Sequence, residues 1–293
     1  MRKIVDECMS RRREGGTFDP VGDLAVPLPV SIIGELLGVG SDRIDDFKRW
    51  SRAAISVISG SDRGEDPSEE SLQAIVDLLA YLSRSARERR KAPSDDLISV
   101  LVTSDKGEDV LDVAEVIMFT TLLLLAGQET TTNLIGSGCL ALLRQPDELA
   151  RLQAEPSRLP EAIEEMARFD SPIQTVFRTA TRDCQIAGTP IAKGSLVAAL
   201  IGSANRDERR FPDPDRLDVG RDARGHLAFG FGPHFCLGAS LARLEAKVAF
   251  ERLVPDLGRY TLASGQPPRQ PSFLVRGPLA LTLHPREQLA AGG

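Results

Sequence analysis

The sequence has little cysteine, and its cysteines are far apart. The four residues are Cys8, Cys139, Cys184 and Cys236, and no two of them form a C-x-x-C pair. This spacing excludes the zinc and iron–sulfur sites that are built from such pairs. The chain also lacks an apolar run of about 20 residues, the length that a transmembrane helix requires. Its most apolar stretch, residues 116–127, is shorter, and we expect it to be a buried helix.

Basic residues, 36 Lys and Arg, are outnumbered by 42 Asp and Glu. The formal net charge is −6, and no long basic run occurs, so a nucleic-acid-binding surface is not expected. The first residues are charged and lack the apolar core of a signal peptide. We therefore expect a cytoplasmic protein without a membrane anchor. The content of 42% hydrophobic and 27% charged residues is that of a globular protein. No repeat or linker divides the chain, which predicts a single domain over residues 1–293.

The hydrophobic pattern is helical up to about Gln174. A central helix is predicted from about Asp112 to Arg144, apolar on nearly every face and hence in the middle of the molecule. After Gln174, β-rich runs alternate with Gly-Thr-Pro and Lys-Gly turns, which is typical of short antiparallel strands. A further helix ends near Val254, and strand-like pieces such as RYTLA and FLVRG follow. The predicted fold class is mainly α with small antiparallel β-sheets.

The stretch FGFGPHFCLG, residues 229–238, surrounds Cys236 with glycine and aromatic residues just before a helical run. Glycines permit a tight turn, and a helix beginning beside the sulfur favours its thiolate form. A lone thiolate can bind a metal as a single axial ligand, as in haem proteins. A buried structural cysteine is the ordinary alternative. A nucleophile of a hydrolase or transferase is a third, but His234 is too close along a constrained turn to be an obvious general base.

The stretch AGQETT places Gly127, Glu129 and Thr130 inside the apolar central helix. A glycine in a helix costs up to about 1 kcal/mol relative to alanine, and a buried carboxylate costs more without a partner. The ordinary interpretation is a polar stripe that contacts another element. The functional one is a helix locally distorted to hold a ligand, with the Thr130 hydroxyl bonding back to the Ala126 carbonyl.

The pattern Phe-Gly-x-Gly-x-His-x-Cys-x-Gly resembles the haem-ligand loop of the cytochrome P-450 superfamily, position by position. The resemblance implies that fold, haem b as cofactor, and Cys236 as the iron ligand. Phe229, Gly230 and Gly238 would then form the cofactor-binding loop. AGQETT resembles the oxygen-binding groove of the family, which implies that Glu129 and Thr130 deliver protons to dioxygen. An acid beside an alcohol indicates a monooxygenase rather than a peroxide-using member.

Three further signatures agree with this family. Glu165 and Arg168 are spaced like its ExxR pair, although the spacing alone is typical of a solvated surface pair. FPDPDRL resembles the later loop that completes this structural network, with Arg216 as the third member. Arg178 and His234 match positions that contact the haem propionates. His226 and His284 are interpreted as ordinary structural histidines.

The implied reaction is the insertion of one oxygen atom of O2 into a small lipophilic substrate, by hydroxylation or epoxidation, as in secondary metabolism. The chain has no flavin or nicotinamide domain, so a ferredoxin and its reductase are the implied electron donors. Arg243 and Lys247 could offer them positive charge near Cys236, or form an ordinary charged helix face. The candidates for the substrate pocket, which are equally consistent with core residues, are Leu124, Ala126, Val176, Phe273 and Leu274.

The sequence departs from the family pattern at its start. The resemblance runs from about Leu28 to Leu283, and the first helices of the family are expected to be absent. A misplaced start, a truncated product and a deliberately short protein are all consistent with this. The alternative function is therefore a truncated, non-catalytic haem-binding or partner-binding remnant of the same family.

Overall fold

A computed structural model describes residues 1–10, 16–61, 66–103, 111–263, 265–269 and 272–286. The chain forms two compact units, Met1–Thr132 and Asn133–Gly293. The long helix α6 (Val113–Arg144) begins in the first unit and ends in the second. The boundary between the units falls inside a continuous helix, so no linker marks it in the sequence. The expectation of a single domain over residues 1–293 stays a prediction.

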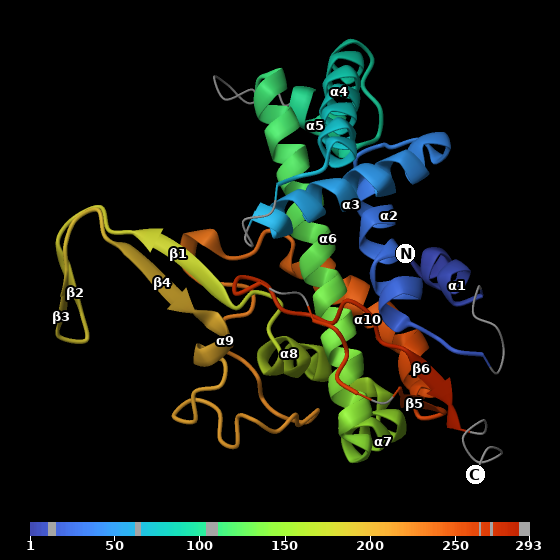
Figure 1. The fold of residues 1–293 in the computed structure, drawn as a ribbon, viewed down its shortest axis with the longest axis vertical. Coiled ribbons are helices and arrows are strands. Elements are labelled where there is room, and N and C mark those ends of the chain that lie inside the picture. The colour runs from blue at the N-terminus through green and yellow to red at the C-terminus, as the bar shows by residue number, and fades with distance from the viewer. Residues whose placement is uncertain (11–15, 62–65, 104–110, 264, 270–271, 287–293) are drawn as a thin grey trace. The chain divides into compact units, whose positions relative to one another are not determined.

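The described part of the first unit is helical (Figure 1). Its elements before α6 are α1 (Arg2–Ser10), η1 (Val21–Ala25), α2 (Pro27–Leu36), η2 (Ser41–Arg43), α3 (Ile44–Ser61), α4 (Glu69–Lys91) and α5 (Leu97–Thr103). Helix α4 begins where the Ser68 hydroxyl accepts a hydrogen bond from the Ser71 N–H at 3.2 Å, a typical N-cap. Helices α3 and α4 pack together, and the rings of Trp50 and Tyr81 lie 5.5 Å apart.

The second unit combines helices and short strands. Its helices after α6 are α7 (Pro146–Ala154), η3 (Pro156–Arg158), α8 (Leu159–Phe169), α9 (Ile201–Ala204), η4 (Gly232–His234) and α10 (Ala239–Leu257). Helices α8 and α10 pack against each other. Gly138 of α6 allows close packing here, because a Cβ atom at this position would lie 2.6 Å from the Phe250 ring and 2.8 Å from the Met166 sulfur.

The strands form antiparallel pairs, as predicted. β1 (Thr175–Thr179) pairs with β4 (Leu196–Leu200), β2 (Cys184–Ile186) with β3 (Thr189–Ile191), and β5 (Tyr260–Leu262) with β6 (Leu283–Pro285). RYTLA contains β5, as expected. FLVRG does not form a strand and contributes only the isolated bridge between Ile173 and Val275. The mainly α fold class with small antiparallel sheets is confirmed.

Helix α6 has the predicted bounds but two different halves. Residues 131–142 are buried without interruption, as expected of a central helix. The first half is not a buried helix, since Met118 is 68% exposed and Leu122 58% exposed. α6 is long and apolar enough to cross a membrane by length and composition. Of the apolar window that meets this test, 22% is buried, whereas residues 131–142 are packed in the core.

Candidate functional site

The loop before α10 presents Cys236 on a tight turn. The Cys236 N–H donates to the Phe229 carbonyl at 2.9 Å, which closes the loop at its two ends. Gly230 and Gly232 have φ values of 74° and 72°, a region that glycine adopts without strain. Cys236 is exposed and forms no disulfide. A Cβ atom built at Gly238 would lie 4.0 Å from the Cys236 sulfur, so this glycine lies close to the sulfur.

The surroundings of Cys236 fit a haem group. In the described part of the chain, no group of three or more His, Cys, Asp and Glu side chains could hold a metal ion. Cys236 is therefore not part of a multi-residue metal cluster among the described residues, which agrees with a single thiolate ligand of a haem iron. Three apolar side chains of the same loop are exposed beside the sulfur: Phe231 by 86%, Phe235 by 52% and Leu237 by 79%. Apolar surface around one accessible thiol suits a flat, apolar macrocycle.

The AGQETT stretch of α6 lies in the first unit. The Thr130 hydroxyl donates to the Ala126 carbonyl at 2.7 Å, as predicted. Gly127 allows a close approach of α2, because a Cβ atom here would lie 3.4 Å from Cδ1 of Ile33. Glu129 and Thr130 are half-buried. The acid and the alcohol are neighbours in the helix, but their side chains point about 100° apart, and Oε1 of Glu129 is buried.

The same face of α6 corrects one of the pocket candidates. Leu124 is completely buried and does not line an open face, whereas Ala126 is exposed. Two residues along a helix correspond to a rotation of about 200°, so these two side chains cannot face the same way. Met118, Leu122 and Ala126 instead follow each other at intervals of four residues and lead to Thr130. The interval of four was visible in the sequence, and could have identified Met118 and Leu122.

The other pocket candidates come together in the second unit. The Gln174 N–H donates to the Leu274 carbonyl at 2.8 Å, and the Thr175 hydroxyl donates to the Phe273 carbonyl at 3.3 Å. Val176 of β1 is therefore close to the segment of Phe273 and Leu274. Phe273 is 62% exposed, and its ring meets that of Phe177 edge-on at 6.2 Å. These residues form an apolar surface at the start of β1.

The two expected propionate ligands are exposed. Arg178 projects from β1, and its guanidinium donates to the Phe177 carbonyl at 2.7 Å. His234 ends the short helix η4 and is exposed two residues before Cys236. Within the described residues both side chains are exposed, so both can reach a ligand. Their roles stay predictions.

Glu165 and Arg168 form a buried pair on α8. Both side chains are 0% exposed, and Nε and Nη2 of Arg168 lie 2.6 and 2.8 Å from the two Glu165 oxygens. Nη1 of Arg168 also donates to the carbonyls of Asn205 and Pro214, at 2.8 and 3.0 Å. The pair is therefore no solvated surface contact. It holds the segment that follows α9 against α8.

The third member of this network is Arg221, and the prediction of Arg216 is wrong. Nε of Arg221 donates to Glu165 at 3.1 Å, and its side chain is only 11% exposed. The Arg216 guanidinium is 64% exposed and contacts Glu148 at 3.2 Å instead. Arg216 offers the network only its carbonyl, which accepts from Arg168 at 3.4 Å. The loop turns between the two arginines and brings the later one inward.

Arg243 forms an ion pair within the second unit. Its Nε and Nη2 atoms donate to the Glu164 carboxylate at 2.6 and 2.8 Å, and its guanidinium lies 4.3 Å from the centre of the Phe229 ring. Nε2 of His226 lies 3.0 Å from the same carboxylate. Burial raises the pKa of Glu164, but the hydrogen bonds from Arg243 and His226 outweigh it and lower the pKa to about 2. Arg243 of α10 therefore belongs to an ion pair, while its role towards an electron donor stays a prediction. His226 is a structural histidine, as expected.

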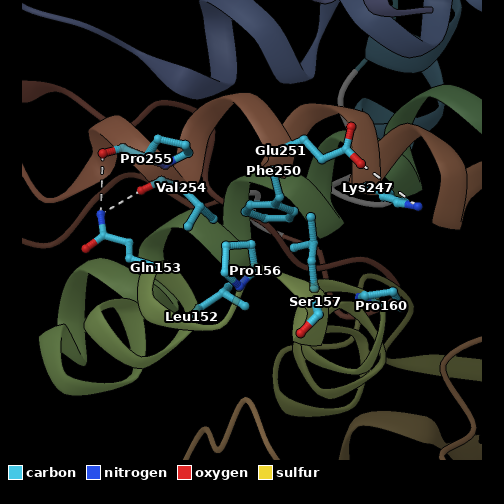
Figure 2. A pocket seen from close by; sticks show the side chains of 11 residues that line it. Leu152, Gln153, Pro156, Ser157, Pro160, Lys247, Phe250, Glu251, Val254 and Pro255 are labelled. Carbon is cyan, nitrogen blue, oxygen red and sulfur yellow. Dashed lines mark hydrogen bonds and ion pairs between the residues drawn. The ribbon is translucent and has the colours of Figure 1, made fainter.

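Lys247 lies at a separate cavity of about 600 Å³ between α10 and the segment from α7 to α8 (Figure 2). Leu152, Phe250 and Val254 give it an apolar lining. Lys247 pairs with Glu251 at 3.9 Å on the rim, as the dashed line in Figure 2 indicates. The Cys236 loop contributes nothing to this lining, so the cavity is distinct from the candidate haem site.

Comparison with known proteins places the chain among similar proteins. The family model described as Cytochrome P450 matches residues 68–283. The chain is 42% identical to Cytochrome P450 107B1 of Saccharopolyspora erythraea, over 88% of this chain and 62% of that relative. It is 40% identical to a Steroid C26-monooxygenase of Mycobacterium tuberculosis, over 94% of this chain and 74% of that relative.

A solved structure shows the same fold. Cytochrome P450 CYP109Q5 from Chondromyces apiculatus matches with a TM-score of 0.86 and 41% identity, over 97% of this chain and 70% of the other. The chain spans less than two thirds of the length of P450 107B1. The family model covers well over half of the chain, and its span includes both the AGQETT helix and the Cys236 loop. The chain belongs to the cytochrome P450 family.

Proposed function

We propose that this protein is a haem-thiolate monooxygenase that hydroxylates or epoxidises a small lipophilic substrate. The observation that carries the proposal is the Cys236 loop, a lone exposed thiol on a glycine turn with apolar side chains beside it. When bound through a thiolate, haem b supplies the activation of O2, because the electron-rich sulfur favours cleavage of the O–O bond. Family membership and the named monooxygenase relatives support this reaction class.

The residues of the chain would divide the work. Cys236 holds the iron, and the Phe229–Gly230 and Gly238 positions shape the loop around it. Arg178 and His234 bind the propionates through charge-assisted hydrogen bonds. On α6, the Glu129 carboxyl and the Thr130 hydroxyl hold and pass on the protons that the reaction consumes. Glu165 and Arg168 touch no reacting atom; they brace the second unit.

The substrate is expected to be apolar. Met118, Leu122 and Ala126 form an exposed apolar strip that leads to Thr130 in the first unit. Phe273 exposes a further aromatic ring in the second. Apolar side chains recognise ligands mainly by burying area, so a lipophilic molecule gains most from these surfaces. A relative named as a Steroid C26-monooxygenase agrees with a substrate of this chemistry. Electrons would come from a ferredoxin and its reductase in the cytoplasm.

Haem loading tests the proposal. The chain is expressed, supplied with haem, reduced and exposed to carbon monoxide. A red-shifted Soret band typical of thiolate ligation is expected, and Cys236→Ala should abolish it. Cys184→Ala is the matched control, because Cys184 is also an exposed free cysteine but lies on β2. Lack of haem uptake, or an equal loss of the band in both variants, would contradict the proposal.

Proton delivery has its own test. In an active preparation supplied with electron donors, Thr130→Ala should release hydrogen peroxide instead of product, because the hydroxyl no longer holds a proton source in place. Thr121 is also half-buried and lies nine residues before Thr130 on α6, where its hydroxyl makes the same kind of bond, to the Ile117 carbonyl at 2.7 Å. Thr121→Ala therefore serves as the control. Unchanged coupling in Thr130→Ala would refute the assigned role.

A further inference from the structure

Glu164 of α8 joins two segments that flank the Cys236 loop. One is the start of α10, through the two hydrogen bonds from Arg243. The other is the chain just before the loop, through His226. The carboxylate thus receives bonds from residues 62 and 79 positions away in the sequence. It connects α8 to both ends of the loop that carries the cysteine.

The bonds of His226 define its form. Its Nδ1 accepts a hydrogen bond from the Ala228 N–H at 3.1 Å, so this nitrogen carries no proton. Nε2 then carries the proton and donates it to Glu164. A neutral imidazole satisfies both contacts, and its side chain is only 5% exposed. The ring is held from two sides and fixes the chain direction at Ala228.

Phe229 is the point at which these contacts converge. The Arg243 guanidinium lies over its ring, and the His226 ring centre lies 5.8 Å from its own. The carbonyl of the same residue accepts the Cys236 N–H. A displacement of Phe229 therefore displaces the hydrogen bond that sets the position of the cysteine backbone.

We propose that Glu164 is a positioning residue for Cys236, acting through Arg243, His226 and Phe229. The inference builds on the proposed function, since it assigns a purpose to the placement of the haem ligand. Glu164 touches neither the sulfur nor any reacting atom. It fixes the Phe229 carbonyl, and thereby the direction in which the thiolate is presented.

The test uses Glu164→Gln, which keeps the shape of the side chain but removes its charge and one acceptor oxygen. Glu161→Gln is the matched control, because Glu161 lies one turn earlier on α8 and is exposed. The first measurement is hydrogen–deuterium exchange in the haem-free chain. We expect exchange at the Cys236 amide to become at least about tenfold faster in Glu164→Gln, in line with the loss of a charge-assisted contact. Exchange at Phe250, farther along α10, should not change.

The second measurement uses the haem-loaded chain. In Glu164→Gln, part of the reduced carbon monoxide complex should move from the thiolate band to the band of a neutral thiol, and the iron midpoint potential should shift. Arg243→Lys provides a second variant if Glu164→Gln does not fold. It keeps the positive charge but loses the two-pronged contact and the ring stacking, so it should show the same changes in weaker form.

The two failures can be told apart. If the unaltered chain takes up no haem, the proposed function fails while the exchange experiment still reports on Glu164. If the unaltered chain gives the thiolate band, and Glu164→Gln matches it in both exchange at Cys236 and spectrum, the positioning role is refuted. Equal effects of Glu161→Gln and Glu164→Gln would refute it as well, because the effect would then come from charge on α8 in general.

Discussion

Replacing Glu245 by glutamine should stabilise the protein at neutral and alkaline pH. Glu245 lies on α10 and is only 2% exposed. Its Oε2 atom has no hydrogen-bond partner within the described residues. Burial without compensation disfavours the ionised form and raises the pKa of this carboxyl to about 8, from an ordinary value of 4.5. The folded protein therefore keeps a proton that the unfolded chain loses.

The direction and size of the effect follow from this difference. Because the folded state binds the proton more tightly, the contribution of Glu245 is most favourable below pH 4.5 and falls as the pH rises to about 8. The difference between the folded-state and ordinary pKa values corresponds to a loss of unfolding free energy of about 5 kcal/mol above pH 8, and of about 3 kcal/mol at pH 7. A whole domain is stable by only about 5–15 kcal/mol, so this loss is large.

Urea denaturation between pH 5 and pH 9 measures this loss of stability. The free energy of unfolding of the unaltered chain should fall with pH more steeply than that of Glu245→Gln, whose amide does not ionise. The difference between the two pH profiles removes the contribution of the titratable groups that both proteins share. Glu161→Gln, an exposed change on α8, should follow the unaltered chain. Parallel pH profiles for the unaltered chain and Glu245→Gln would refute the reasoning, since Glu245 would then ionise equally in both states.

Three further changes test the packing and the ion pairs. Arg221→Gln should destabilise the chain by about 3 kcal/mol in thermal or urea unfolding, because it leaves part of the buried Glu165 charge without a partner. Arg216 is exposed, so Arg216→Gln should change the free energy of unfolding by no more than about 0.5 kcal/mol. Equal losses in the two variants would contradict the assignment of Arg221. Gly138→Ala should cost about 1–3 kcal/mol, because its methyl group meets the Phe250 ring, and unchanged unfolding would show that the ring yields without cost. The pKa of Glu164 is lowered, so its contribution to the free energy of unfolding should be complete above pH 4.5 and disappear as the pH falls towards 2. Identical acid-unfolding curves for the unaltered chain and Glu164→Gln would contradict this contribution.

Local patterns in the sequence were sufficient for much of this structure. The bounds of α6 follow from a continuous run of helix-forming residues, and the turn at Cys236 from its glycines, two of which have positive φ. The bond from Thr130 to Ala126 was also predictable, because a threonine in a helix reaches the carbonyl four residues earlier. Each of these depends on residues that are close together in the chain.

The errors concern contacts between distant segments. The sequence pattern favours Arg216 as the further partner of Glu165, and only the course of the loop shows that Arg221 takes this place. The ion pair of Arg243 could not be read from the sequence either, because its carboxylate partner Glu164 lies 79 residues earlier. Leu124 is an error of another kind, because the rotation per residue of an α-helix already separates it from Ala126.

Glu164 and Glu165 illustrate what such distant contacts add. Neighbouring positions on a helix point about 100° apart, so the two carboxylates serve different segments. Glu165 holds the loop of Asp218 and Arg221, and Glu164 holds the segments beside Cys236. Buried ion pairs contribute little net stability, because removal of their charges from water costs about as much as the pairing returns. These ion pairs instead fix each loop in one conformation, because only that conformation satisfies the buried charges. Loss of the Glu165 carboxylate would leave Arg168 and Arg221 buried without their partner and cost stability, whereas loss of the Glu164 carboxylate would chiefly release the segments beside Cys236.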